Sequence, residues 1–142
     1  MLVLLQILLK NEVVKMKMSN RTLVKTINGL VSFKNNGARK PIKAIYTINR
    51  NIEMLDKAAI PFQESRKELI EKYCDKKENG DVVPKKGMEQ DLESELGELL
   101  DGIEVDVDVY KIPISLIENI EASELEFEAL SMMLEESEAE KA

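Results

Sequence analysis

The sequence predicts an α+β fold in which helices dominate: a helical hairpin, a small antiparallel β element and a C-terminal helix. Apolar residues recur every three or four positions over residues 41–73 and alternate with acidic residues over residues 103–112. An Asn-Gly pair lies between these two stretches. The first pattern is typical of a helix and the second of a half-buried strand. The Asn-Gly pair is the strongest short signal for a β-hairpin. The length of 142 residues is that of a single domain.

We divide the chain into an apolar N-terminal extension (1–15), one α+β domain (16–134) and an acidic tail that frays (135–142). The opening run MLVLLQILLK reaches a charge at Lys10, short of the about 20 residues that a membrane-spanning helix needs. It also lacks the basic start and small-residue cleavage site of a signal peptide. Met16 or Met18 is an alternative start of the natural chain, and an oligomerising helix is an alternative role for the extension.

The first helix is expected to start at Ser19 or Asn20, because short polar side chains satisfy the early helical N–H groups. It is expected to end within 34–37, where Asn and Gly accept left-handed backbone angles. Its apolar face contains Leu23, Ile27, Leu30 and Val31.

The second helical stretch begins near Pro41, which suits a first helical turn. Ile48, Ile52 and Leu55 belong to its apolar seam, which we expect to pack on the first helix or on a second copy of the chain. Pro61 lies inside the stretch and predicts a kink or a break, since proline has no N–H to donate.

The remaining elements follow from short local signals. Asn79-Gly80 predicts a turn before a short strand at 81–83. Met88 to Leu100 reads as a helix with its leucines inward, closed by Gly102. Residues 103–112 form the alternating strand, and 114–117 a further strand or a turn. Ser123 and Glu126 form a capping box for the last helix, whose inner face is assigned to Leu125, Leu130, Met133 and Leu134.

The composition argues against several kinds of chemistry. The chain has no histidine and a single cysteine, Cys74. It therefore lacks the usual acid–base group, the commonest zinc ligand and any disulfide. Residues 75–86 superficially resemble a calcium loop, but lysines stand at ligand positions where carboxylates are required. We predict a protein that is not an enzyme and that needs neither a cofactor nor a metal.

Charge is distributed unevenly along the chain. Residues 1–87 contain 18 Lys and Arg against 9 Asp and Glu, whereas residues 88–142 contain 2 against 18. Such asymmetry indicates either that the halves pack on one another or that each presents a charged face to a partner.

Glu104, Asp106 and Asp108 share one face of the alternating strand, next to Tyr110. We predict that these four residues bind a protein partner with a basic surface, with Tyr110 as an anchor. The alternatives are a solvated strand face that prevents aggregation, neutralisation of the chain's own basic helices, and a site for a hard cation.

A basic run gives a second alternative, a nucleic-acid or small-molecule binder. Phosphates could be contacted by its cations, and bases could stack on Phe33 and Tyr46. The run consists of Lys34, Arg39, Lys40, Lys43 and Arg50.

The order of elements also resembles a known group. The strings NRTLVKTINGL, ARKPIKAIYTINRNIEML, SRKELIEKY, ELLDGIEVDVDVYKI and SELEFEALSMMLEE are similar to small uncharacterised phage and prophage proteins of Gram-positive bacteria. The resemblance covers residues 19–136 and departs at Pro61, where the family pattern suggests a continuous helix. It carries no active site.

The resemblance implies a phage setting, in which small acidic proteins are often blockers of host defence or parts of the virion. We therefore expect a non-catalytic accessory protein in the host cytoplasm that binds a host or phage protein. A virion structural or assembly component, present in repeated copies, is the alternative. We expect no membrane association.

Overall fold

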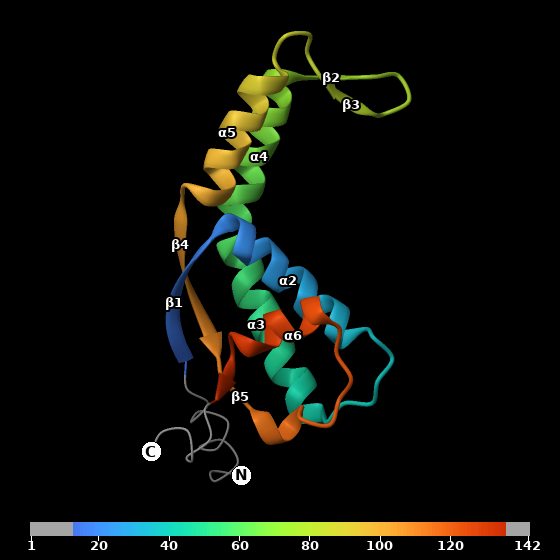
Figure 1. Cartoon of the computed structure of the whole chain (residues 1–142), viewed down its shortest axis with the longest axis vertical. Coiled ribbons are helices and arrows are strands. Elements are labelled where there is room, and N and C mark those ends of the chain that lie inside the picture. The colour runs from blue at the N-terminus through green and yellow to red at the C-terminus, as the bar shows by residue number, and fades with distance from the viewer. Residues whose placement is uncertain (1–12, 136–142) are drawn as a thin grey trace.

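The computed structural model describes residues 13–135. These residues form a body and an arm that projects from it (Figure 1). The described part is a helix-dominated α+β structure with short two-stranded sheets, which confirms the predicted fold class. In chain order, the elements are β1 (Val13–Ser19), α2 (Asn20–Lys34), α3 (Ile42–Ala58), α4 (Ile60–Tyr73), β2 (Cys74–Lys76), β3 (Val82–Pro84), α5 (Glu89–Asp101), β4 (Glu104–Tyr110), β5 (Ile112–Pro113), a 3-10 helix (Ile114–Leu116), α6 (Glu124–Ser131) and β6 (Leu134–Glu135).

The body is built around an antiparallel ribbon of β1 and β4. Helix α3 packs on β4 and on α2, and α2 packs on α6. The apolar sides of these elements meet in one core, because each buries a single stripe or face against the others. Its largest fully buried apolar side chains are Leu23, Leu30, Phe33, Ile48, Leu55, Val109, Ile112 and Met133.

Strand β1 changes the predicted boundary of the domain. It begins at Val13, so residues 13–15, which we had assigned to the extension, pair with β4. The pattern Val-Lys-Met-Lys-Met over 14–18 has the period of two of a half-buried strand, but the apolar run before it obscured this signal. Residues 1–12 and 136–142 lie outside the described residues.

The predicted start and end of the first helix and the predicted break in the second helical stretch are confirmed. The Ser19 hydroxyl accepts a hydrogen bond from the N–H of Thr22 and caps α2, which ends before Gly37 at a φ of 84°. The second stretch breaks at Ala59, with Pro61 in the first turn of α4. Pro41 caps α3 rather than lying in its first turn.

The seam of α3 is buried as predicted at Ile48 and Leu55, whereas Ile52 is only partly buried. The three residues pack in the body against α2 and the ribbon. A seam covered within one chain does not require the second copy that was the alternative.

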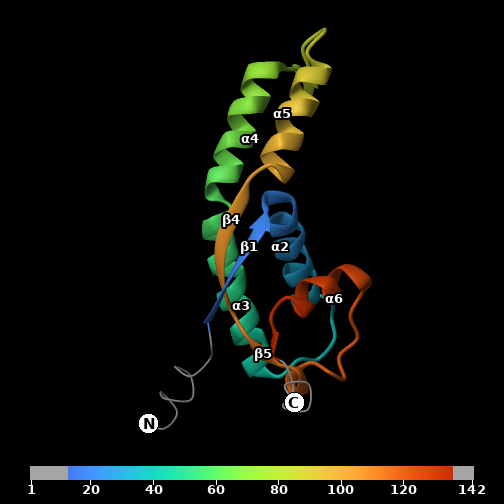
Figure 2. The same ribbon diagram turned by 60° about the vertical axis from the view of Figure 1, so that its left-hand side comes forward.

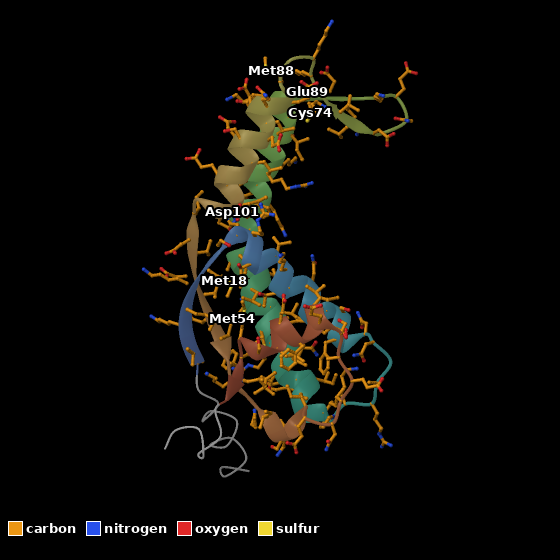
Figure 3. All side chains as sticks on the ribbon, viewed as in Figure 1. Met18, Met54, Cys74, Met88, Glu89 and Asp101 are labelled. Carbon is orange, nitrogen blue, oxygen red and sulfur yellow. The ribbon has the colours of Figure 1, made fainter. Side chains whose placement is uncertain are left out.

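Helices α4 and α5 lie side by side and form the arm, which carries the β2–β3 hairpin at its tip (Figures 1 and 2). The predicted Asn79-Gly80 turn is confirmed, with Gly80 at a φ of 92°. Figure 3 places Cys74 and Met88 near the tip, and Asp101 at the base where α5 meets the body.

Two side chains of α2 tie the arm to the body. Nδ2 of the buried Asn20 donates to the carbonyl of Leu99 at 2.9 Å. Nε and Nη2 of Arg21 donate to the two carboxylate oxygens of Asp101 at 2.8 and 2.9 Å. The hydrogen bond from Arg21 lowers the pKa of Asp101 from its ordinary value.

The capping box of α6 is confirmed, but its inner face was assigned partly wrongly. Leu125 is exposed, and the buried face of α6 contains Glu126, Ala129 and Leu130. The assignment failed because a carboxylate takes an inward position. The 114–117 segment forms a 3-10 turn and no strand.

Glu126 can be buried because several donors reach its carboxylate. The N–H of Ser123 and Nδ2 of Asn36 donate to Oε1 at 3.2 Å each, and the hydroxyl of Ser32 donates to Oε2 at 3.1 Å. These hydrogen bonds, the one from Ser123 most of all, lower the pKa of Glu126 from its ordinary value. They outweigh burial, which by itself would raise that pKa. The side chain thereby joins the end of α2 to the start of α6.

Candidate partner-binding surface

The predicted acidic row lies on the outer face of the β1–β4 ribbon. Val107 and Val109 of β4 are buried in the core, whereas Glu104 and Asp106 are exposed and Asp108 is half-buried. This is the alternation expected of a strand that covers a core with one face. Ile103, the first residue of the predicted alternating strand 103–112, precedes β4 and is exposed.

The acidic row has a basic row beside it. In the antiparallel register Asp108 lies opposite Lys15, Asp106 opposite Lys17 and Glu104 opposite Ser19. Directly opposed residues of two strands have Cβ atoms about 4.5–5.5 Å apart, close enough for opposite charges to attract. The carboxylates are therefore neighbours of a basic strand of the same chain. The predicted alternative was that these carboxylates neutralise the basic helices of the chain. The residues opposite them are instead the lysines of strand 13–19, which the sequence did not indicate as partners.

Tyr110, the fourth predicted site residue, is held from α3. The guanidinium of Arg50 lies 3.7 Å from the centroid of the Tyr110 ring and 5.6 Å from that of Tyr46. The backbone of Tyr110 is held too, because its N–H donates to Oδ1 of Asn51 at 2.6 Å and its carbonyl accepts from Nδ2 at 2.9 Å. Asn51 is fully buried, so this clamp fixes the position of β4 on α3.

Exposed apolar groups adjoin the stacked residues. Ile42, Tyr46 and Arg50 are four residues apart along α3 and therefore lie on one helical face. Ile42 is 78% exposed and Tyr46 48% exposed, and Val13, opposite Tyr110 in the ribbon, is 48% exposed. We name Val13, Ile42, Tyr46, Arg50 and Tyr110 the Tyr–Arg surface. Ile42 and Val13 were missed because nothing in the local pattern distinguishes an exposed apolar residue from a core residue.

The nucleic-acid alternative loses one of its two aromatic residues. Phe33 is fully buried in the core, so no base can stack on it. Lys40 lies over that ring at 5.1 Å and donates from Nζ to Oδ1 of Asn36 and to the carbonyl of Ala38. Arg50 is occupied by the two tyrosines. The basic run is thus divided between a loop, two helix ends and the Tyr–Arg surface.

Within residues 13–135, no group of three or more His, Cys, Asp or Glu side chains is placed to hold a metal ion. The 75–86 segment, which had been compared with a calcium loop, forms the β2–β3 hairpin and its flanks. None of the described helices is both long and apolar enough to cross a membrane.

No family model, no curated protein and no solved structure matches this chain. The resemblance to phage proteins therefore stays a prediction.

Proposed function

We propose that this protein is a non-catalytic binding protein whose partner, another protein, docks on the Tyr–Arg surface. The observation that supports this is the stacking of Arg50 on Tyr110, with Tyr46 and Ile42 exposed beside it. Tyrosine and arginine are enriched among the few residues that carry most of the binding energy of an interface. Their mutual stacking fixes side chains that would otherwise lose conformational freedom on binding.

The acidic row has a supporting role in this proposal. Glu104, Asp106 and Asp108 attract a basic surface, and charge complementarity mainly accelerates encounter and selects the partner. Lys15 and Lys17 weaken that attraction locally. We therefore assign the affinity to the Tyr–Arg surface and the selection to the acidic row.

The phage setting comes from the sequence resemblance. In that setting we propose an accessory protein of the host cytoplasm that binds a host or phage protein, with inhibition of a host defence protein as its task. The arm supports a second candidate, a virion or assembly component. A helical pair with a hairpin at its tip, standing out from the core, suits contacts between neighbouring subunits.

Photo-crosslinking tests the docking surface. A crosslinking amino acid replaces Tyr46 in one variant and Phe127 in a control variant, since Phe127 is also an exposed aromatic residue, on α6. In an extract of the cell that produces the protein, position 46 should give one saturable adduct that unlabelled wild-type protein displaces. Protein with Arg50→Ala and Tyr110→Ala should fail to displace it.

Three outcomes contradict parts of this proposal. Equal adducts from positions 46 and 127 would exclude the Tyr–Arg surface. Adducts between copies of the chain would favour the assembly component. Changing Glu104, Asp106 and Asp108 to Lys should slow association with the identified partner and alter its salt dependence, and an unchanged association rate would remove the acidic row from the proposal.

A further inference from the structure

The two edges of the β1–β4 ribbon differ in what meets their outward backbone N–H and carbonyl groups. On the β4 edge, Asn51 takes both the N–H and the carbonyl of Tyr110, so these groups point away from β1. Backbone groups along a strand point alternately to its two sides, so those of Asp108 also point away from β1. Because Lys15 lies opposite Asp108 in the register, its own N–H and carbonyl point away from β4. The same holds for Lys17.

The edge formed by the backbone of Lys15 and Lys17 is open among the described elements. Strand β1 packs on β4 and on the start of α2, and Figures 1 and 2 show it at the surface of the body. The side chains of Lys15 and Lys17 are exposed. Val14 and Met16, on the inner side of the strand, remain half-buried although they adjoin the core. A further strand at this edge would cover them.

The strand that β1 already binds indicates which sequence suits its second edge. Strand β4 reads Glu-Val-Asp-Val-Asp-Val over residues 104–109; its carboxylates lie beside the lysines and its valines face the core. A strand on the other side of β1 would meet the same lysines and the same inner apolar row. We propose that this open edge binds an extended segment of another protein, in which carboxylates alternate with branched apolar residues, by strand addition.

A second copy of the chain fits this edge poorly. Two β1 strands paired antiparallel would set Lys15 and Lys17 of one copy beside the same lysines of the other, and like charges directly opposite destabilise a sheet. The edge lies on the opposite side of the ribbon from Arg50 and Asn51. Of the Tyr–Arg surface only Val13 belongs to β1, and the proposed strand addition uses the backbone of Lys15 and Lys17, so the inference does not depend on the function proposed above.

A labelled peptide with the sequence of residues 103–110, IEVDVDVY, is the probe, and its fluorescence anisotropy with the full-length protein is the measurement. A carboxylate residue opposite Lys15 must turn its N–H toward β1, because the backbone groups of Lys15 point to the new strand. N-methylation of the peptide at its acidic residues should therefore abolish binding, and N-methylation at its valines should not. A peptide with lysines in place of its three acidic residues should not bind.

The protein offers a matched pair of variants. Lys15→Pro removes the outward N–H without removing a bond to β4, a position at which an edge strand tolerates proline. Lys15→Ala removes the charge and keeps the N–H. Lys15→Pro should bind the peptide about three- to tenfold more weakly than Lys15→Ala, the change expected from one lost hydrogen bond.

The results that overturn the proposal are specific. If the peptide instead displaces β4, N-methylation at the valines will abolish binding and Lys15→Pro will have no effect. If both methylated peptides bind, charge attraction alone explains the affinity. Concentration-dependent dimers in light scattering that Lys15→Pro removes would assign the edge to a second copy. The two methylated peptides decide the question even if Lys15→Pro does not fold.

Discussion

The body and the arm bury their apolar residues to different depths. In the body, three helices and a ribbon enclose side chains with no exposed surface, such as Phe33 and Ile48. In the arm, Leu92 and Leu96 stay half-exposed, and the buried Phe62 and Leu99 do not belong to the core cluster. Two helices can cover only one stripe of each other, whereas several layers can enclose a side chain completely. The difference indicates that the free energy of folding comes mainly from the body.

Equivalent truncations in the two regions should give the largest difference. Ile48→Ala should lower the free energy of unfolding by about 2–5 kcal/mol, as large-to-small core changes do. Leu96→Ala should lower it by about 1 kcal/mol, because a half-exposed side chain loses only part of its transfer free energy. Urea denaturation measures both values. Equal losses would show that Leu96 in the arm contributes as much to stability as Ile48 in the body.

Asn51 should be the most sensitive polar residue of the body. Asn51→Ala removes both partners of the Tyr110 backbone and should cost about 2–3 kcal/mol, because unpaired polar groups in a poorly hydrated site are expensive. Asn49→Ala, at an exposed asparagine of the same helix, is the matched control and should change stability little. If the two variants melt at the same temperature, the clamp does not hold the ribbon on α3.

Replacing a helical glycine by alanine should lower the free energy of unfolding in the body and raise it in the arm. A Cβ atom at Gly29 in α2 would lie 2.6 Å from Cβ of Ala129 and 2.8 Å from the carbonyl oxygen of Leu125, whereas one at Gly97 in α5 meets no described atom within 4 Å. Gly29→Ala should therefore cost about 1–3 kcal/mol through overpacking of α2 on α6. Gly97→Ala should stabilise by about 0.5–1 kcal/mol through helix propensity. Thermal melts check both signs, and a stabilising Gly29→Ala would mean that α6 can move away at little cost.

The smallest effect concerns two carboxylates and the pH. The folded pKa of Glu126 is lowered, so its stabilising contribution is complete above the ordinary glutamate pKa of about 4.3 and is lost as the pH falls through the lower folded value. Glu126→Gln should therefore be less stable than wild type at pH 7, and the difference should shrink below about pH 4. Urea denaturation at several pH values measures this difference. A difference that does not vary with pH would mean that the charge of Glu126 contributes nothing.

Glu95 in the arm is the matched control. Its Oε2 is buried and meets no hydrogen-bond donor among residues 13–135. Glu95→Gln should therefore cost little at neutral pH, because no hydrogen bond to that oxygen is lost. A loss as large as that of Glu126→Gln would show that the arm holds its carboxylate as firmly as the body does.

The parts predicted correctly depend on local chemistry. Pro61 breaks its helix wherever the helix packs, since the missing N–H belongs to the residue itself. Asn79-Gly80 and the Ser123–Glu126 capping box are likewise satisfied within a few residues. In the candidate site, the outward position of Glu104, Asp106 and Asp108 was predictable from the alternation of apolar and acidic residues alone.

The errors arose where a distant partner decides the outcome. Leu125 is exposed and Glu126 is buried, the reverse of the expected positions, because Ser32 of α2 and Asn36 of the turn after it donate to the Glu126 carboxylate. Phe33 was considered for stacking, yet it is buried because α2 turns that face to the core.

The sequence by itself determined the helices, their breaks and caps, the hairpin turn and the acidic face of 104–110, because each depends on neighbours within about one turn of helix or two residues of strand. The tertiary structure alone decided that Lys15 and Lys17 lie beside that acidic face and that Arg50 stacks on Tyr110. It also decided that Asn51 binds the backbone of Tyr110 on one edge of the ribbon, while the other edge is open among the described elements. These contacts join residues 59 or more positions apart. Their register is set by which faces the core buries together, and no local pattern specifies that choice.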